Sequence, residues 1–294
     1  MSKTIIFFGT DTFSASALTA LIEADYTIGA VITKPDSKSG RGQRLGAPLV
    51  KTYAQQNNIP VWQPAKLIDV IDDIRVIAET NDIIGVLSSY GKIIPQAIID
   101  LFNPGIINIH PSLLPLYRGP SPIETAIANG DTQTGVSIMK LTAEMDAGPV
   151  YAQEIVKLDG TETAPELESN LSGLGARMLI ETLPSIIEAN LLPSPQQNAA
   201  IYCYLLKKED ALLNPAEITA VEAERRVRAY LAFPKTKLTL LDQLVIVTKA
   251  HVSSEQTSAL DVAFEGGQFL SIDELIGPSG RSMSGNAFLN GYKP

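Results

Sequence analysis

Short apolar runs alternate with stretches of helical periodicity along the first 190 residues. Apolar runs bounded by glycine or polar residues are typical of strands, whereas apolar residues that recur every three to four positions indicate amphipathic helices. The predicted strands cover 4–8, 27–32, 83–87, 105–109, 136–140 and 150–156, and a further short strand begins at Val61. The predicted helices cover 13–24, 47–57, 95–101, 121–128 and 164–189. This order predicts an α/β domain built from βαβ units around a mostly parallel sheet.

The composition changes at residues 190–200, which hold two prolines and several amide side chains but few apolar residues. Such a segment is typical of a linker. Beyond it, we expect strands at 237–241, 245–248, 260–264 and 268–272, and helices at 216–231 and 284–289. Short strands joined by turns predict a small barrel or sandwich. We therefore expect two domains, residues 1–195 and residues 196–294.

Composition and charge narrow the class of protein. Of the 294 residues, 45% are hydrophobic and 19% are charged, which is typical of a globular protein and excludes a disordered chain. The formal net charge of −9 excludes a protein coated in basic charge but allows a local basic patch. Residues 34–51 carry five basic residues and one acid, and residues 225–237 carry five basic residues and no acid. Each patch is either a phosphate contact or a solvated surface.

The single cysteine, Cys203, excludes an internal disulfide and any multi-cysteine metal site. The apolar runs are far shorter than the ~18 residues that a membrane-spanning helix needs. The residues that lead into the first predicted strand show no cleavage-site pattern of a secretory signal peptide. We therefore expect a cytoplasmic protein with no membrane segment and no bound metal.

Two polar residues, Asn108 and His110, stand at the end of the predicted buried strand that begins at Gly105. Because they are two positions apart, both side chains point to the same face of that strand. Ligands of a parallel sheet bind in the crevice beyond the carboxyl ends of its strands. The pair is therefore either part of an active site or a hydrogen-bonded structural pair, since burying polar groups without partners costs free energy.

The residues that follow favour an active site. Pro111 to Pro115 form a rigid apolar loop that cannot continue the strand, because proline lacks the ladder donor. Arg118 comes next, and Asp146 supplies a carboxylate before the next strand. An amide, an imidazole and a carboxylate suit acyl transfer, in which an attacking amine loses a proton and an oxyanion is stabilised. No serine elbow or metal-ligand cluster competes, and the Gly9-Thr10 turn lacks the further glycines of a dinucleotide fingerprint.

Several motifs identify a family. They are Asn108-Ile-His110-Pro-Ser-Leu-Leu-Pro115, Tyr117-Arg-Gly119, Asp146-Ala-Gly148, Lys34-Pro-Asp36 with Gly40-Arg-Gly42, Ser89-Tyr-Gly-Lys-Ile-Ile-Pro95, and Met283-Ser-Gly-Asn-Ala-Phe-Leu-Asn-Gly291. On these motifs the chain resembles the formyltransferases that use 10-formyltetrahydrofolate, and among them the family that acts on methionyl-tRNA. The resemblance runs from about residue 4 to residue 292.

The resemblance implies a Rossmann-like domain followed by a small β-barrel of the oligonucleotide-binding (OB-like) type. It implies that Asn108, His110 and Asp146 are catalytic, and that the partners are 10-formyltetrahydrofolate and methionyl-initiator tRNA. The expected folate contacts are Ser112, Leu113, Leu114, Pro115 and Tyr90. The expected tRNA contacts are Arg41, which matches a loop arginine of the family, and its basic neighbours Lys38 and Arg44. Nothing in the sequence demands more than a monomer.

Other functions stay open. A formyltransferase for a sugar or nucleotide amine would share the trio but would not need the Gly40-Arg41-Gly42 loop or the second domain. A formyltetrahydrofolate hydrolase would use the trio with water as acceptor. A non-catalytic nucleic-acid-binding protein would not need the trio, and the net charge opposes it. One residue departs from the family pattern: Asp11 follows Gly9-Thr10, where the family usually has proline.

Overall fold

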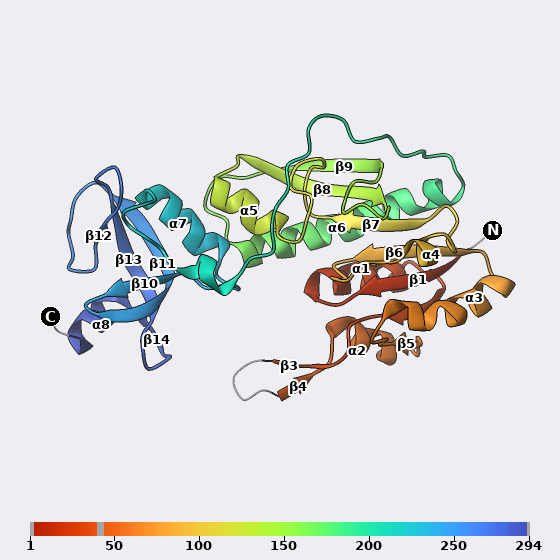
Figure 1. Cartoon of the computed structure of the whole chain (residues 1–294), viewed down its shortest axis with the longest axis horizontal. Coiled ribbons are helices and arrows are strands. Elements are labelled where there is room, and N and C mark those ends of the chain that lie inside the picture. Colours follow the sequence, from red (N-terminus) through yellow and green to blue (C-terminus); the bar gives the residue numbers. More distant parts are fainter. Residues whose placement is uncertain (1–2, 40–43, 293–294) are drawn as a thin grey trace. The chain divides into compact units, whose positions relative to one another are not determined.

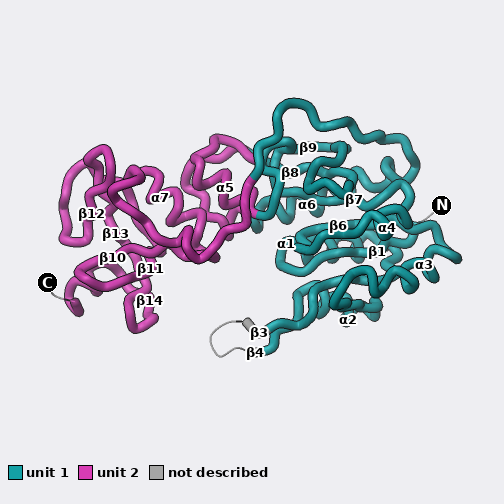
Figure 2. The backbone as a smooth tube through the Cα atoms, viewed as in Figure 1, with its two compact units in different colours: residues 1–120, 135–156, 168–202 teal, residues 121–134, 157–167, 203–294 magenta. Residues whose placement is uncertain are grey.

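The computed structural model of the protein describes residues 3–39 and 44–292 (Figure 1). The side chains of Lys38, Ser39 and Arg44 are likewise outside the description. The chain divides into two compact units that interleave along the sequence (Figure 2). Unit 1 comprises residues 1–120, 135–156 and 168–202, and unit 2 comprises residues 121–134, 157–167 and 203–294. Each unit therefore depends on contacts between segments that are far apart in the sequence.

Unit 1 is built around a seven-stranded sheet with the order β5-β2-β1-β6-β7-β8-β9. Its strands are β1 (Thr4–Gly9), β2 (Ile28–Ile32), β5 (Val61–Trp62), β6 (Ile83–Ser88), β7 (Ile106–His110), β8 (Gln133–Lys140) and β9 (Val150–Lys157). The first five strands in this order pair in parallel, and β8 runs antiparallel to β7. Every residue of β1 and β7 is buried, as apolar strands inside a parallel sheet require. The predicted α/β class with a mostly parallel sheet is confirmed.

Helices connect the parallel strands. They are α1 (Thr12–Glu23), α2 (Leu49–Gln56), the 3-10 helix η1 (Leu67–Val70), α3 (Ile71–Thr80) and α4 (Gln96–Ile99), and the later α6 covers Ala164–Ile187. The sequence did not predict α3 or the hairpin formed by β3 (Ser37–Ser39) and β4 (Arg44–Gly46). Only Ile74 of α3 is fully buried, so that helix carries a narrow apolar stripe that is easily missed.

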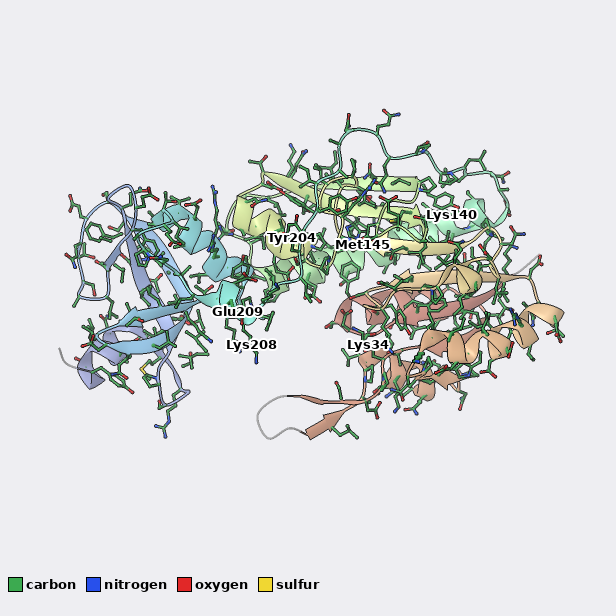
Figure 3. The ribbon with its side chains drawn as sticks, in the orientation of Figure 1. Lys34, Lys140, Met145, Tyr204, Lys208 and Glu209 are labelled. Carbon is green, nitrogen blue, oxygen red and sulfur yellow. The ribbon has the colours of Figure 1, made fainter. Side chains whose placement is uncertain are left out.

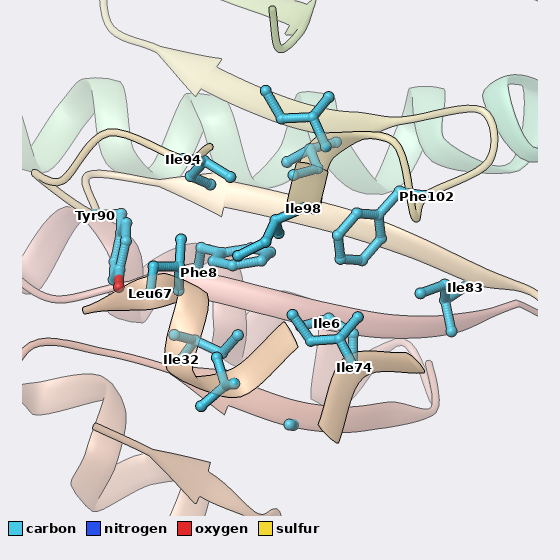
Figure 4. Packing of buried hydrophobic residues seen from close by; sticks show 14 residues of the cluster. Ile6, Phe8, Ile32, Leu67, Ile74, Ile83, Tyr90, Ile94, Ile98 and Phe102 are labelled. Atoms are coloured by element: carbon cyan, nitrogen blue, oxygen red, sulfur yellow. The ribbon is translucent and has the colours of Figure 1, made fainter. Parts of the chain in front are cut away.

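A core of unit 1 joins β1 and β2 to the segment that follows β6 (Figure 4). Phe8 of β1 is fully buried, and its ring meets those of Tyr90 and Phe102 edge-on, with both centroid distances at 5.9 Å. Ile6 and Ile32 extend the same cluster along the sheet. This packing fixes the chain just beyond the carboxyl ends of β1 and β6.

Unit 2 contains a five-stranded antiparallel sheet with the order β10-β11-β13-β12, in which β14 also pairs with β13. The strands are β10 (Lys237–Leu240), β11 (Gln243–Ser253), β12 (Val262–Ala263), β13 (Phe269–Ile276) and β14 (Ser282–Ser284). The helices are α5 (Pro122–Asn129), α7 (Ala220–Ala229) and α8 (Gly285–Gly291), with the 3-10 helix η2 (Lys208–Ala211). Leu270, Val245, Val227 and Phe288 share one buried cluster, so α7 and α8 pack on this sheet. Among the residues that the structure describes, no helix combines the length and apolar character needed to cross a membrane.

Candidate active site

Strand β7 places Asn108 and His110 at its carboxyl end. Asn108 pairs with Leu87 of β6 and with Met139 of β8, and His110 pairs with Ser137. Both side chains are buried, with exposed fractions of 4% and 5%. The two-residue period of the strand therefore puts an amide and an imidazole on one face at the edge where parallel sheets bind ligands.

A backbone carbonyl determines which nitrogen of His110 carries a proton. His110 Nε2 lies 3.0 Å from the carbonyl oxygen of Tyr117. A carbonyl only accepts, so the neutral imidazole holds its proton on Nε2, and Nδ1 keeps its lone pair. Tyr117 has a positive φ of 55°. Nδ1 is therefore the basic atom of the site.

Asp146 faces that basic atom. Its Oδ1 lies 3.8 Å from His110 Nδ1, and the two side chains are 15% and 6% exposed. The other oxygen, Oδ2, accepts a hydrogen bond of 2.8 Å from the amide of Gly119. The 3.8 Å distance is too long for a hydrogen bond but short enough for a strong charge interaction once the imidazole is protonated.

A residue in the predicted linker braces this arrangement. Gln196 Nε2 donates to the backbone oxygens of Asp146 (2.7 Å) and Gly148 (2.8 Å). Its Oε1 accepts from Arg118 Nε (3.0 Å) and Nη2 (2.7 Å). Arg118 also lies 3.7 Å from Glu144 and over the ring of Tyr202. Sequence reasoning missed Gln196, because nothing in a polar segment 50 residues away signals a contact with Asp146.

The side-chain amide of Asn108 makes no hydrogen bond to any residue that the structure describes. The residue is 4% exposed, and its amide atoms are not among the fully shielded, unpaired polar atoms of the described residues, so they keep some contact with solvent. Its N–H groups are therefore available to an oxygen of a bound molecule.

The expected folate segment is held by β8 and β9. Ser112 is 1% exposed, and its carbonyl accepts from Ser137 Oγ at 2.6 Å. The Leu114 amide donates to the same Ser137 oxygen at 3.1 Å, and Gln153 Nε2 donates to the Leu114 carbonyl at 2.8 Å. Leu113 packs against Gly135, where an added Cβ would lie 2.5 Å from its Cδ2 atom. Pro115 follows a cis peptide bond. The loop is therefore fixed by Ser137 of β8 and Gln153 of β9.

Tyr90 lies in the hydrophobic core beside Phe8, after β6, the strand that neighbours β7. It is 1% exposed, and burial raises the pKa of its hydroxyl to about 12. That hydroxyl has no hydrogen-bond partner within the described part of the chain. An unpaired buried hydroxyl of this kind costs free energy, and Thr33, Ser88, Thr248 and Ser271 carry others among the described residues.

The expected tRNA contacts are Lys38, Arg41 and Arg44. Arg41 lies outside the described residues. Lys38 and Arg44 are placed on the two strands, in β3 and β4, but their side chains are not described. Their expected role therefore stays a prediction.

Asp11, which departs from the family pattern, caps a helix. It is the N-cap of α1, and its Oδ1 accepts from the backbone amide of Ser14 at 3.2 Å. Its other oxygen accepts from the Ser89 hydroxyl. The carboxylate is thus engaged with the helix N-terminus, where negative charge is favourable.

The site thus combines an amide with free donors, a base with a free lone pair, and a carboxylate facing that base. Across residues 3–39 and 44–292, no group of three or more metal-ligating side chains is found. This set suits acyl transfer to an amine, with a donor for an oxyanion and an acceptor for a proton.

Comparison with known proteins defines the class. The Formyl transferase family matches residues 2–183, and the chain belongs to this family. Its curated relatives include the methionyl-tRNA formyltransferase of Chloroflexus aurantiacus, 37% identical over 98% of this chain and 96% of that protein. The methionyl-tRNA formyltransferase of Lactobacillus acidophilus is 36% identical over 98% and 95%. The predicted family is confirmed.

Two solved structures share the fold. An N-formyltransferase from Helicobacter canadensis, solved with folinic acid and dTDP-3-aminofucose, has a TM-score of 0.68 at 19% identity and covers 92% of this chain and 99% of that chain. HypX from Aquifex aeolicus has a TM-score of 0.68 at 15% identity, over 99% of this chain and 49% of that longer chain. At these identities the likeness extends to the fold alone.

Proposed function

We propose that this protein transfers a formyl group from 10-formyltetrahydrofolate to the α-amino group of methionyl-initiator tRNA, for translation initiation in the cytoplasm. The observation that carries this proposal is the 36–37% identity to methionyl-tRNA formyltransferases over nearly the whole of both chains. The N-formyltransferase solved with dTDP-3-aminofucose also covers 92% of this chain, but at 19% identity, so the sequence identity and not the extent of the fold favours methionyl-tRNA over a sugar amine.

The catalytic roles follow from the geometry around β7. The free amide of Asn108 donates a hydrogen bond to the formyl oxygen, on which negative charge develops as the amine attacks. His110 Nδ1 accepts the proton that the attacking amine loses, and it returns this proton to the leaving nitrogen. Asp146, 3.8 Å from Nδ1, stabilises the imidazolium between these two steps. A positioned donor such as Asn108 is worth about 3–4 kcal/mol in acyl transfer.

The folate fits the polar atoms that this part of the chain leaves without partners. The Tyr90 hydroxyl is buried and unpaired among the described residues. Asn108 lies at the end of β7 with an amide that bonds to no described residue, and the braced loop of Ser112, Leu113, Leu114 and Pro115 follows that strand. We assign these residues to folate binding. When bound, 10-formyltetrahydrofolate supplies the formyl group.

The tRNA contacts are assigned to Lys38, Arg41 and Arg44 and to the C-terminal part of the chain. We propose a catalytic domain of residues 1–195 and a tRNA-binding domain of residues 196–294, the latter an OB-like barrel. The antiparallel sheet of unit 2 supports this architecture. We further propose that the protein acts as a monomer.

A formylation assay tests the proposal. Purified protein would be given 10-formyltetrahydrofolate and methionyl-tRNA, in initiator and elongator forms. We expect rapid formylation of the initiator form, a loss of at least a hundredfold in Asn108→Ala, and little change in Asn190→Ala, which removes an exposed amide just after α6. Arg41→Ala is expected to lower kcat/KM for charged tRNA about tenfold or more.

Two outcomes would redirect the proposal. Formyl transfer to a nucleotide sugar, with none to tRNA, would identify an amine formyltransferase of another class. Release of formate without any amine acceptor would identify a hydrolase. An unchanged kcat/KM in Arg41→Ala would remove the loop from tRNA recognition.

A further inference from the structure

Unit 1 has a hollow of about 460 Å³ at the carboxyl edge of its sheet. Thr10 directly after β1, Lys34 after β2 and Lys92 after β6 contribute to its lining, together with Asp36 and Pro48 on either side of the β3–β4 hairpin. Because β1, β2 and β6 are parallel neighbours, these segments leave the sheet at the same edge. The hollow thus lies at the edge to which β7 also brings its polar pair.

The Lys34 ammonium has no hydrogen-bond or ion-pair partner among the residues that the structure describes. It lies against the backbone of Gly91, where an added Cβ would be 2.3 Å from Lys34 Nζ. Gly91 has a φ of +66°, a conformation that glycine adopts without strain. The sequence thus provides room for an ammonium group at this wall of the hollow.

The second ammonium, on Lys92, is oriented but not neutralised. Its Nζ donates to the backbone oxygens of Pro64 at 3.2 Å and Ala65 at 3.3 Å. Carbonyl oxygens fix the direction of the ammonium but carry only partial charge. No acidic side chain of the described residues pairs with Lys92 at the hollow.

Among the described residues that line the hollow, Asp36 is the one acid, and it is already paired elsewhere. Asp36 accepts two hydrogen bonds of 2.8 Å from Lys51 and one of 2.7 Å from Gln63. These bonds hold the pKa of the Asp36 carboxyl below its ordinary value. With Asp36 neutralised by Lys51, the charges of Lys34 and Lys92 remain as a net excess of two, so an anion is favoured.

We propose that Lys34 and Lys92 form a pocket for a phosphate of the unpaired 3′-terminal nucleotides of the tRNA acceptor end. This assignment of the pocket to tRNA rests on the proposed function. Most of the lining follows β1 and β2, which are two and three strands from β7, so the pocket lies roughly 10–15 Å along the sheet from His110. That spacing suits a substrate whose amine is at His110 and whose terminal phosphate is in the pocket. Ser37 and Gly46, the first pair of the β3–β4 hairpin, also line the hollow, so it adjoins the segment to which the proposed function assigns tRNA contacts.

Lys140 offers a matched control within the same unit. It lines a separate hollow of about 360 Å³ and lies against Gly105, as Lys34 lies against Gly91. It ends β8 opposite the amino end of β7, so it sits at the other edge of the sheet. Figure 3 labels both lysines and shows them on different parts of unit 1. Lys140→Met removes the same charge and keeps the alkyl stem.

The test measures binding of uncharged initiator tRNA as a function of salt, without turnover. Lys34→Met and Lys92→Met are each expected to weaken binding about tenfold and to lower the slope of log K against log salt by about one, the change for one lost phosphate contact. Lys34→Arg and Lys92→Arg, which keep the charge, are expected to restore most of the affinity. Lys140→Met is expected to leave affinity and slope unchanged. Thermal melting of each variant identifies any loss of folded protein.

Three results would overturn the pocket. The first is an unchanged salt slope in both methionine variants, and the second is an equal effect of Lys140→Met. The third is a raised KM for 10-formyltetrahydrofolate with unchanged tRNA affinity, which would assign the pocket to a folate carboxylate. If the wild-type protein binds tRNA through these lysines but does not formylate it, the proposed function is refuted and the phosphate pocket is retained.

Discussion

The interaction between His110 and Asp146 gives the sharpest prediction. Asp146→Asn removes one negative charge and preserves shape, and its side-chain oxygen can still accept the 2.8 Å hydrogen bond from Gly119. The substitution therefore isolates the charge that faces His110 Nδ1. Its amide N–H, if turned toward Nδ1, would also oppose protonation of that nitrogen.

The magnitude follows from the distance. Two unit charges 3.8 Å apart attract by about 4 kcal/mol at an effective dielectric constant of about 20. The side chains are only 6% and 15% exposed, so solvent screens the pair weakly. If the imidazolium forms in the rate-limiting step, losing this attraction slows that step about a thousandfold.

The assay is single-turnover formyl transfer at saturating substrate, which reports the chemical step apart from product release. Glu144→Gln is the matched control, because Glu144 is a nearby carboxylate that contacts Arg118 and whose side chain is 72% exposed. We expect the control to stay within about twofold of wild type, since exposed ion pairs contribute little.

A decrease of less than about tenfold in Asp146→Asn would refute the reasoning, because the 3.8 Å distance requires a larger effect. An equal decrease in Glu144→Gln would also refute it, since the effect would then belong to the general charge of the loop. With either result, the role of Asp146 would be limited to its hydrogen bond with the Gly119 amide.

Three further predictions concern positioning and stability. Gln196→Ala is expected to lower kcat about ten- to a hundredfold, because it removes the side-chain amide that bonds both to the Asp146 backbone and to Arg118. Steady-state kinetics measures this decrease, and the control Gln197→Ala should leave kcat unchanged. Asp11→Ala is expected to lower the free energy of unfolding by about 1 kcal/mol through loss of the α1 cap, while Asp11→Asn keeps most of it; urea unfolding distinguishes the two. Burial raises the pKa of Asp261, but hydrogen bonds from Thr257 and Ser258 outweigh it and lower the pKa overall. The Asp261 carboxylate therefore adds to the free energy of unfolding above its unfolded-state pKa of about 4. This contribution is lost as the pH falls through the lower pKa of the folded state. Asp261→Asn should reduce stability at neutral pH, and unfolding curves for variant and wild type should converge in acid.

The sequence determined the elements whose patterns are local. The buried runs Thr4–Gly9 and Ile106–His110 became central strands, because a strand covered on both faces must be apolar throughout. The two-residue period placed Asn108 and His110 on one face, and the motifs around them identified the family. Local periodicity was too weak for α3, which buries only Ile74 completely.

The tertiary structure decided the contacts between distant segments. Gln196 braces Asp146 across 50 residues, and the carbonyl of Tyr117 fixes the proton of His110, yet neither has a sequence signature. Lys34 and Lys92 come together only because β2 and β6 flank β1 in the sheet. Periodicity encodes which face a side chain occupies, whereas the pairing of strands determines which faces meet.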